Sequence, residues 1–252
     1  MSMSCYPAVV AIETLAPMPN GSTPEAGAII ASWLGRVEYG EALAFQKRLV
    51  AERADGRIGD QLLLLEHPRV LTLGRTADPA HIRADPARLA AQGIEVIRVE
   101  RGGEVTYHGP GQLVAYPIMA LSPRGLLVRP FVRALEAALV ATCAAYGVVA
   151  ARRDGHPGCW CDPDGTDPRK IGALGLRIER GVSYHGIALN VTADLADFEL
   201  IDPCGMPGVT STSIASERGE TTSSPTTRSV ERAAAIFAGA FAARLGAPLT
   251  GI

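Results

Sequence analysis

The sequence predicts one α/β (or α+β) domain built around a mixed β-sheet. The chain has 252 residues, which suits one sizeable domain and is short for two. Hydrophobic residues make up 47% of it, a fraction that is normal for a globular protein and sufficient for a full core. Strand-like runs dominate the middle of the chain and helical periodicities interrupt them, which is the pattern of the α/β class.

The N-terminal part is expected to contain an extension followed by a helix. Residues 1–30 carry several prolines and little periodicity, so they predict a flexible extension to a domain that spans 31–252. The apolar residues of Glu41–Ala54 recur in a helical rhythm, and Asp55-Gly56 directly after them suits a helix end.

Four segments are expected to form strands before the next helix. The apolar run Gln61–Glu66 is short and is closed by Pro68, so a buried strand fits it better than a helix. Val70–Gly74, Ile94–Val99 and Gln112–Met119 also have strand-like composition.

The second half is expected to contain two helices around a strand hairpin. Apolar residues at steps of four predict a helix over 128–146, and an Ala-rich pattern predicts another over Val230–Leu245. Two alternating segments, 171–179 and 182–191, are joined by a short turn and predict a hairpin. Residues 154–168 are rich in Gly, Pro and Asp, which predicts a loop.

Composition argues against several classes of protein. The net charge of -2 gives no strong field for nucleic acid or an anionic membrane. No stretch of about 18 or more uninterrupted apolar residues occurs, which argues against a membrane span. No Lys or Arg precedes Arg36, so the basic region of a secretory signal is missing. Five irregularly spaced cysteines make a poor disulfide framework, and the cytoplasm, where a thiol stays reduced, is the expected location.

The densest candidate for a binding site is the Gly-rich segment Arg101–Gln112. Glycines after a strand let the backbone approach a ligand, and Arg101, Thr106 and His108 supply polar groups in the same stretch. The glycines match neither Gly-x-x-x-x-Gly-Lys nor Gly-x-Gly-x-x-Gly, so a nucleotide phosphate is not the expected ligand. A structural turn remains the alternative to a site.

Lys170 is a candidate acid/base residue. It precedes the apolar start of a predicted strand, and partial desolvation there would let an amine exchange a proton near neutral pH. A solvated surface lysine is the commoner case for a residue taken alone. However, Lys47 and Lys170 are the only lysines in a chain that otherwise uses arginine, and arginine does not deprotonate.

Cys204 is a candidate nucleophile. It stands between Pro203 and Gly205, a context typical of a tight turn that exposes the sulfur. A thiolate is the reactive form of cysteine, and a nearby cation is the usual means of producing it. A small buried residue is the alternative, and that alternative is favoured for Cys143 on its apolar helix face.

Two other features offer weaker signals. Cys159 and Cys161, with His156 nearby, could ligate zinc, but the Cys-x-Cys spacing is tighter than usual and no second pair follows, so no metal is expected. His108 and His185 each fit either a core histidine with a satisfied ring or a wall of the site.

Five blocks of the sequence together resemble the octanoyltransferases of lipoate biosynthesis, the lipoate-protein ligase B family. The resemblance runs from about Leu34 to about Ser213, some 180 residues. The blocks stand in the order of the family: Leu65–Pro68, Arg101–Gln112, Lys170–Ala173, His185–Asn190 and Pro203–Gly205.

The resemblance implies a single catalytic domain of the biotin/lipoate protein ligase type, with a mixed sheet flanked by helices. It implies transfer of octanoate from octanoyl-acyl carrier protein to a lysine of a lipoyl domain, without a cofactor. Acceptors in this family are lipoyl domains of 2-oxoacid dehydrogenase complexes and the glycine cleavage H protein. Donor and acyl-enzyme are both thioesters, so the first step is nearly isoenergetic.

The resemblance also implies roles for individual residues. The cysteine that matches Cys204 forms the acyl thioester, and the lysine that matches Lys170 lowers its pKa. Three further blocks are expected to bind the acyl substrate: Arg101, Gly102, Gly103, Glu104, Val105, Thr106, Tyr107 and His108; Ala173, Leu174 and Gly175; and Gly186, Ile187 and Ala188.

Two alternative functions remain open at this point. An ATP-dependent lipoate or biotin ligase would share the fold but would not need a thiol nucleophile, so Cys204 favours acyl transfer. A non-catalytic module that only holds an acylated or lipoylated partner is the second alternative. The acyl chain length, the preferred lipoyl proteins and the oligomeric state are not predicted.

Overall fold

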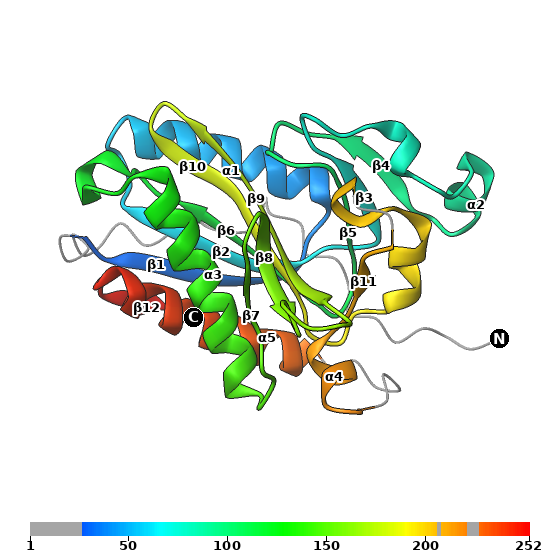
Figure 1. Ribbon diagram of the computed structural model, residues 1–252. Coiled ribbons are helices and arrows are strands. Elements are labelled where there is room, and N and C mark those ends of the chain that lie inside the picture. The colour runs from blue at the N-terminus through cyan, green and yellow to red at the C-terminus, as the bar shows by residue number, and fades with distance from the viewer. Residues whose placement is uncertain (1–26, 206–207, 221–226) are drawn as a thin grey trace.

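A computed structural model describes residues 27–205, 208–220 and 227–252 (Figure 1). For Cys204 the backbone is described, whereas its side chain lies outside the described part. No helix in these residues is long and apolar enough to cross a membrane.

The central sheet is mixed, as predicted. Its strand order is β12-β1-β2-β6-β10-β9-β8-β7, and β11 pairs with β9. The pairs β12–β1, β1–β2 and β11–β9 are parallel and the others are antiparallel. The strands are β1 (Ile29–Arg36), β2 (Asp60–Glu66), β6 (Gln112–Ile118), β7 (Ala151–Arg153), β8 (His156–Cys161), β9 (Arg169–Glu179), β10 (Val182–Asn190), β11 (Thr210–Ser211) and β12 (Leu249–Gly251).

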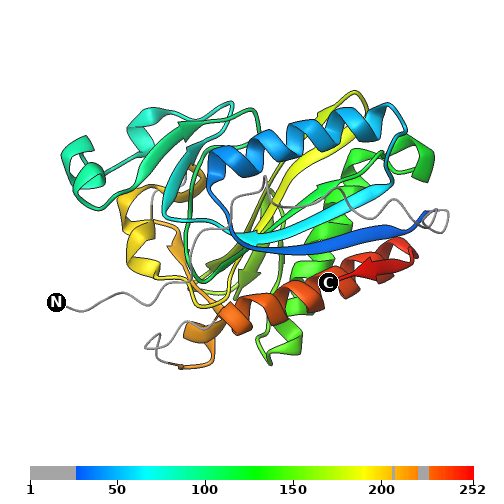
Figure 2. The same ribbon diagram turned by 180° about the vertical axis from the view of Figure 1, so that it is seen from behind.

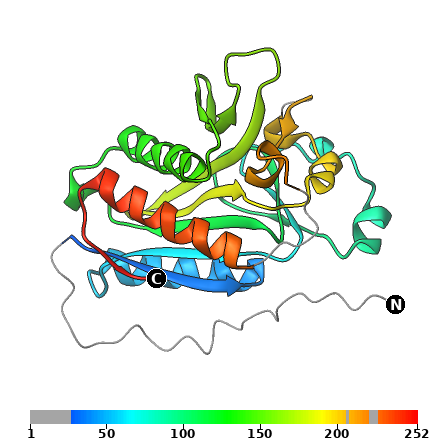
Figure 3. The ribbon, with the colours of Figure 1, turned by 90° about the horizontal axis from the view of Figure 1, so that it is seen from below.

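Helices cover both faces of this sheet (Figures 2 and 3). Helix α1 (Tyr39–Ala54) lies on one face, and α3 (Val128–Ala145) packs with α5 (Thr227–Leu245) on the other. Alternate residues of β2 serve the two sides: Leu62 and Leu64 pack toward α3 and α5, and Leu63 and Leu65 pack toward α1. Because both faces are covered, the middle of the strand is a continuous run of leucines instead of an alternating pattern.

A second, three-stranded sheet stands at one end of the central sheet (Figure 1). Its order is β4-β3-β5, and it has a hydrophobic core of its own that includes Leu71, Val105 and Tyr107. This small sheet consists of β3 (Val70–Leu73), β4 (Glu95–Arg98) and β5 (Val105–His108), next to helix α2 (Pro86–Ala91). The short helix α4 (Ile214–Glu217) follows β11. Among the described residues there are also four 3-10 turns: Pro79–His81, Ser122–Arg124, Leu195–Leu200 and Pro203–Gly205.

The predicted helices and strands are confirmed, with ends that differ by up to three residues. The predicted hairpin is also confirmed: Glu179 pairs with Val182, and Arg180 (φ 50°) and Gly181 (φ 79°) form the turn between them. Two left-handed residues are typical of the turns that match the twist of a hairpin.

Two boundaries differ from the predictions. Ile29 and Ile30 already belong to β1, and residues 1–26 of the expected extension lie outside the described residues. The predicted loop 154–168 is wrong in its first half, because β8 occupies His156–Cys161. Gly and Pro masked the strand signal there, whereas burial of Cys159, Trp160 and Cys161 against β9 stabilises it.

Candidate active site

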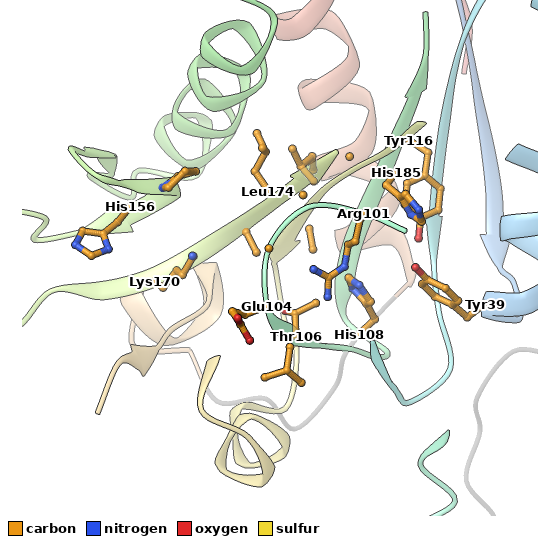
Figure 4. A pocket seen from close by; sticks show the side chains of 18 of the residues that line it. Tyr39, Arg101, Glu104, Thr106, His108, Tyr116, His156, Lys170, Leu174 and His185 are labelled. Carbon is orange, nitrogen blue, oxygen red and sulfur yellow. The ribbon is translucent and has the colours of Figure 1, made fainter. Parts of the chain in front are cut away.

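A cavity of about 240 Å³ lies where the central sheet meets the small sheet. It is called the central cavity below (Figure 4). Thirteen of its lining residues are among those expected from the sequence: Arg101, Gly103, Glu104, Val105, Thr106, His108, Lys170, Ala173, Leu174, Gly175, Gly186, Ile187 and Ala188. Four other residues that line it were given no site role by the sequence: Tyr39, Tyr116, Gly155 and Pro157. His156, which the sequence offered as a zinc ligand, and His185, which fitted either a core histidine or a wall of the site, also line the cavity.

Small residues of β9 and β10 form one wall of the central cavity. The two strands pair Ala173 with Ala188 and Gly175 with Gly186, so the small side chains lie side by side. A Cβ at Gly186 would lie 2.0 Å from the carbonyl oxygen of Ala115, and one at Gly175 would lie 2.9 Å from that of Gly102. These glycines are therefore required by close contacts between backbones.

Arg101 joins the Gly-rich segment to the small sheet. Its side chain is buried, and its Nη2 donates hydrogen bonds of 2.8 Å to both the carbonyl and the hydroxyl oxygen of Thr72. The backbone N–H of Gly102 donates to the carbonyl of Leu176 on β9 at 2.9 Å. The segment therefore bridges the two sheets over the cavity, which explains why Gly102 itself does not line it.

Tyr107 does not line the central cavity either, although it belongs to the expected site block. It is almost fully buried in the core of the small sheet, and its hydroxyl donates a 2.5 Å hydrogen bond to Oδ2 of Asp197. Its neighbours Thr106 and His108 point the other way, as alternation along β5 requires. Neighbouring residues of this sequence block therefore lie on opposite faces of β5.

Lys170 stands at one end of the cavity. It is the second residue of β9 and its side chain is only 7% exposed, so the expectation of partial desolvation is met. Figure 4 shows it near His156, whereas Tyr39, Tyr116 and His185 lie at the opposite end. A second hollow, of about 20 Å³, is lined by Lys170 together with Thr106 and Pro203.

The backbone on either side of Cys204 lies beside this end of the cavity. Pro203 shares the small hollow with Lys170. Gly205 has a left-handed backbone (φ 65°), and a Cβ there would lie 2.9 Å from Cγ of Glu104, a residue of the cavity wall. The turn Pro203–Gly205 therefore stands close to Lys170 and Glu104. The Cys204 side chain lies outside the described part of the chain, and so does the distance from its sulfur to Nζ of Lys170.

The small sheet and the loops next to it hold this turn in place. Asp202 N–H donates to the carbonyl of His81 at 2.8 Å, and Arg83 N–H donates to that of Leu200 at 2.8 Å. Further along the same segment, the carboxylate of Asp197 accepts from Nε of Arg69 at 2.9 Å and from the hydroxyl of Tyr107. Burial and this carboxylate both raise the pKa of Tyr107, so its hydroxyl remains a donor.

Neutral histidines and tyrosines close the far end of the cavity. Burial lowers the pKa of His67 to about 4 and those of His108 and His185 to about 3. The Nδ1–H of His67 donates to the carbonyl of Val37 at 2.7 Å, so its Nε2 accepts from the hydroxyl of Tyr116 at 2.7 Å. These groups add hydrogen-bonding capacity to the wall without adding charge at neutral pH.

His185 is held in a backbone conformation that non-glycine residues rarely adopt. Its φ is 55° within β10, and its N–H donates to Oε1 of the buried Gln46 at 2.8 Å. Such strain, of roughly 1–3 kcal/mol, persists where surrounding contacts enforce it and is concentrated at functional sites. This signal is not visible in the sequence.

The zinc alternative is not supported by the position of its ligands. Cys159 and Cys161 point into the main core beside Cys143, which is buried as expected. A hydrogen bond with Cys143, followed by burial, raises the pKa of Cys159, and burial raises that of Cys161 to about 12. Among the described residues no group of three or more His, Cys, Asp or Glu side chains is placed to hold a metal ion.

Comparisons with known proteins agree with this geometry. Residues 38–237 match the family model of the lipoyl protein ligase A/B catalytic domain. The chain is 49% identical to an octanoyltransferase of Chloroflexus aurantiacus over 189 residues, which is 75% of this chain and 83% of that protein. It is 50% identical to an octanoyltransferase of Acidobacterium capsulatum over 181 residues, which is 69% of this chain and 74% of that protein.

Solved structures share the fold at low identity. A crystal structure of lipoate-protein ligase A bound with ATP superposes with a TM-score of 0.62 at 16% identity, covering 90% of this chain and 88% of that one. The family model and the relatives cover well over half of the chain, and the residues that the family model matches include those that line the cavity. The chain therefore belongs to the octanoyltransferase family, whose catalytic domain is that of the lipoyl protein ligases A and B.

Proposed function

We propose that this chain transfers an octanoyl group from octanoyl-acyl carrier protein to a lysine of lipoyl domains, through a thioester on Cys204. The observation that carries the proposal is a buried lysine, Lys170, at the end of the central cavity where the Pro203–Gly205 turn passes. A thiol on that turn and an amine in that wall are the two groups that acyl transfer requires. The acceptors would be lipoyl domains such as those of 2-oxoacid dehydrogenase complexes and the glycine cleavage H protein.

In the first step the thiolate of Cys204 attacks the carbonyl carbon of the donor thioester. The new carbon–sulfur bond forms as the bond to the carrier thiol breaks, and the ammonium of Lys170 gives a proton to the leaving thiolate. One thioester replaces another, so no ATP is consumed. The developing oxyanion needs donors, and the backbone N–H groups of Gly103 and Glu104, which line the cavity, are the candidates.

In the second step the amine of the acceptor lysine attacks the Cys204 thioester. An amide bond forms, the carbon–sulfur bond breaks, and Cys204 leaves as a thiolate. The neutral amine of Lys170 takes the proton that the acceptor nitrogen loses. Lys170 thereby returns to the ammonium form, ready for the next cycle.

The apolar walls of the cavity support an acyl ligand. The apolar residues that line it are Val105, Leu174, Ile187 and the two alanines, Ala173 and Ala188. Burying acyl carbons against such a wall contributes about 0.8 kcal/mol for each CH2 group. The neutral histidines at the far end avoid placing a charge near an alkyl chain.

A ligase that activates a free acid with ATP is the competing function on this fold. The solved ligase structure bound with ATP demonstrates nucleotide binding for that protein. The Gly-rich segment here lacks both phosphate-binding glycine patterns, and a ligase has no use for a thiol at position 204. These two features favour transfer between thioesters.

The deciding experiment is the intact mass of the protein after incubation with octanoyl-acyl carrier protein. Wild type should gain one octanoyl group that hydroxylamine removes, and Cys204→Ala should gain none. Cys143→Ala, a matched change of a buried core cysteine, should still be acylated. Acylation of Cys204→Ala at the wild-type level would exclude the thioester mechanism. Efficient transfer from octanoate and ATP without the carrier would instead establish a ligase.

A further inference from the structure

The ring of His185 lines the far end of the central cavity, and neither of its nitrogens has a hydrogen-bond partner among the described residues. The residue is only 1% exposed. Burial lowers its pKa to about 3, so at neutral pH the ring carries one N–H donor and one acceptor nitrogen. Buried polar groups of native proteins are nearly always hydrogen-bonded, so a buried ring with two unbonded nitrogens indicates that a polar group binds there.

Neighbouring side chains add to the polar character of this end. The hydroxyl of Tyr116 donates to Nε2 of His67 at 2.7 Å, and its oxygen remains an acceptor. The rings of Tyr116 and His185 meet edge to face with their centroids 6.4 Å apart, and Figure 4 shows them beside each other. The amide nitrogen of the buried Gln46 also has no partner among the described residues. Donors and acceptors are therefore both present at this end, which is the combination that recognises an O–H group.

The fold fixes the distance of this ring from the other end of the cavity. The backbone N–H of His185 donates to Oε1 of Gln46 at 2.8 Å, and its ring stacks on that of Tyr184 with centroids 4.8 Å apart. His185 pairs with Leu176 of β9, six residues after Lys170 in the same strand. At about 3.3 Å per residue, the backbones at the two ends are roughly 20 Å apart, and the side chains of Lys170 and His185 fill part of that length.

The part of the cavity between the two ends suits an alkyl chain. Leu174 and Ile187 line it together with the small residues of β9 and β10. Methylene groups are favoured against such a wall. They are disfavoured against His185, because an unbonded donor and an unbonded acceptor would then be buried without water.

We propose that the far end of the central cavity is a subsite for an O–H group, and that His185 in this subsite limits the length of the acyl chain. The proposal rests on the proposed function, which places the carbonyl of the acyl group at the Lys170 end. Beyond an octanoyl chain, water can supply the O–H group, whereas a chain that ends in a hydroxyl supplies its own. Additional methylene groups would displace water from the ring nitrogens and return no hydrogen bond. The ligand class expected besides octanoyl is therefore the medium-chain acyl group with a hydroxyl at its end.

The test compares two ligands of equal length, 8-hydroxyoctanoate and nonanoate, which differ only in a hydroxyl in place of a terminal methyl group. A shorter pair, 6-hydroxyhexanoate and heptanoate, places the same difference before the subsite, in the apolar part of the cavity. NMR titration of the full chain measures the dissociation constant of each free acid. The preference for hydroxyl over methyl should be at least about tenfold greater in the long pair than in the short pair.

Two substitutions suit the backbone of His185, whose φ is 55°. His185→Gly removes the ring, so the hydroxyl preference of the long pair should fall to that of the short pair and dodecanoate should bind at least about fivefold more tightly. His185→Asn keeps a donor and an acceptor on a shorter side chain and should retain part of the preference. Tyr184→Phe is the matched control, because it removes a neighbouring hydroxyl that contacts Glu179 and does not line the cavity, and it should keep the wild-type preference.

Equal hydroxyl preferences in the long and short pairs would overturn the proposal from wild type alone, whether or not the His185 variants fold. A preference that survives in His185→Gly would also overturn it. Competition between 8-hydroxyoctanoyl and nonanoyl carrier proteins, followed as masses of the acyl-enzyme, extends the test to the reaction, and the hydroxylated chain should be loaded first. The dissociation constants need no transfer step, so failure to form any acyl-enzyme would refute the proposed function without deciding the subsite.

Discussion

The central sheet and the small sheet contribute to the site by different physical means. The central sheet places Lys170 and the small-residue wall by strand register, with Ala173 opposite Ala188 and Lys170 opposite Trp160. The small sheet places the Cys204 turn by side chains, through the Asp197 carboxylate and a few backbone hydrogen bonds. Of the two residues proposed to react, Lys170 is therefore positioned by backbone pairing, and the turn that carries Cys204 is held by polar contacts around Asp197.

This difference predicts how substitutions in each part of the site will act. Register cannot shift by less than a residue, and a shift of one residue would turn every side chain of the strand to the opposite face. The contacts of a single carboxylate, that of Asp197, can lengthen gradually, so the turn can move by a small distance. We expect substitutions around Lys170 to act through chemistry, and substitutions around Asp197 to act through the position of the turn.

The largest expected effect concerns the central sheet. Lys170→Arg keeps the positive charge but should lower octanoyl transfer by at least about 100-fold, because arginine does not return a proton at neutral pH. Single-turnover transfer to a lipoyl domain measures this loss. Lys47→Arg is the matched control, since the only other lysine of the chain forms an exposed ion pair with Glu100 at 2.6 Å. Turnover of Lys170→Arg within about threefold of wild type would remove Lys170 from the acid/base role.

The next effect concerns the small sheet. Asp197→Asn removes the charge that holds Arg69 and the Tyr107 hydroxyl, and charge-assisted hydrogen bonds are worth about 1.5–3 kcal/mol each. Formation of the Cys204 acyl-enzyme should slow by about tenfold, with Tyr107→Phe changing it less in the same direction. Asp154→Asn, at a carboxylate 99% exposed, should have no effect. Loss of thermal stability with an unchanged acylation rate would show that the clamp stabilises the fold without positioning the turn.

The sequence predicts segments with strong apolar periodicity better than Gly-rich ones. Apolar runs such as Gln61–Glu66 and the amphipathic helix 128–146 carry strong local signals, and the structure has both within a residue or two. Strand β5 lies inside a Gly-rich segment that was interpreted as a candidate binding loop, and β8 lies inside a segment rich in Gly, Pro and Asp. In both strands pairing with a neighbour overrides local propensity.

The site shows the same division. Sequence blocks identified thirteen residues that line the cavity, but they gave no reason to separate Tyr107 from its neighbours. Only the alternation along β5, once the strand is known, sends Tyr107 to the core and Thr106 to the cavity. Tyr39 on α1 and Tyr116 on β6 reach the cavity through tertiary packing alone, so no motif could have revealed them.

The smallest effect at neutral pH concerns the boundary between the two regions, where His67, His108 and His185 are buried. Burial holds their pKa values at about 3 to 4 in the folded protein, below the usual 6.5. Between pH 6.5 and pH 3 to 4 these histidines bind more protons in the unfolded chain than in the folded one. The free energy of unfolding that depends on their neutral form is therefore complete above pH 6.5 and is lost as the pH falls toward 3 to 4.

Urea unfolding at pH 7.5, 6.0 and 5.0 measures this loss. Each histidine should contribute a slope on the order of 1.4 kcal/mol per pH unit well below 6.5, and carboxylates with lowered pKa values such as Glu217 add to it only at lower pH. His185→Gln should make the slope shallower, because one buried proton acceptor is removed. A free energy of unfolding that stays constant from pH 6.5 to 5 would mean that the histidines protonate without disturbing the boundary. The two sheets would then be joined by their backbone contacts at Gly102 and Gly175 and not by the neutral cluster.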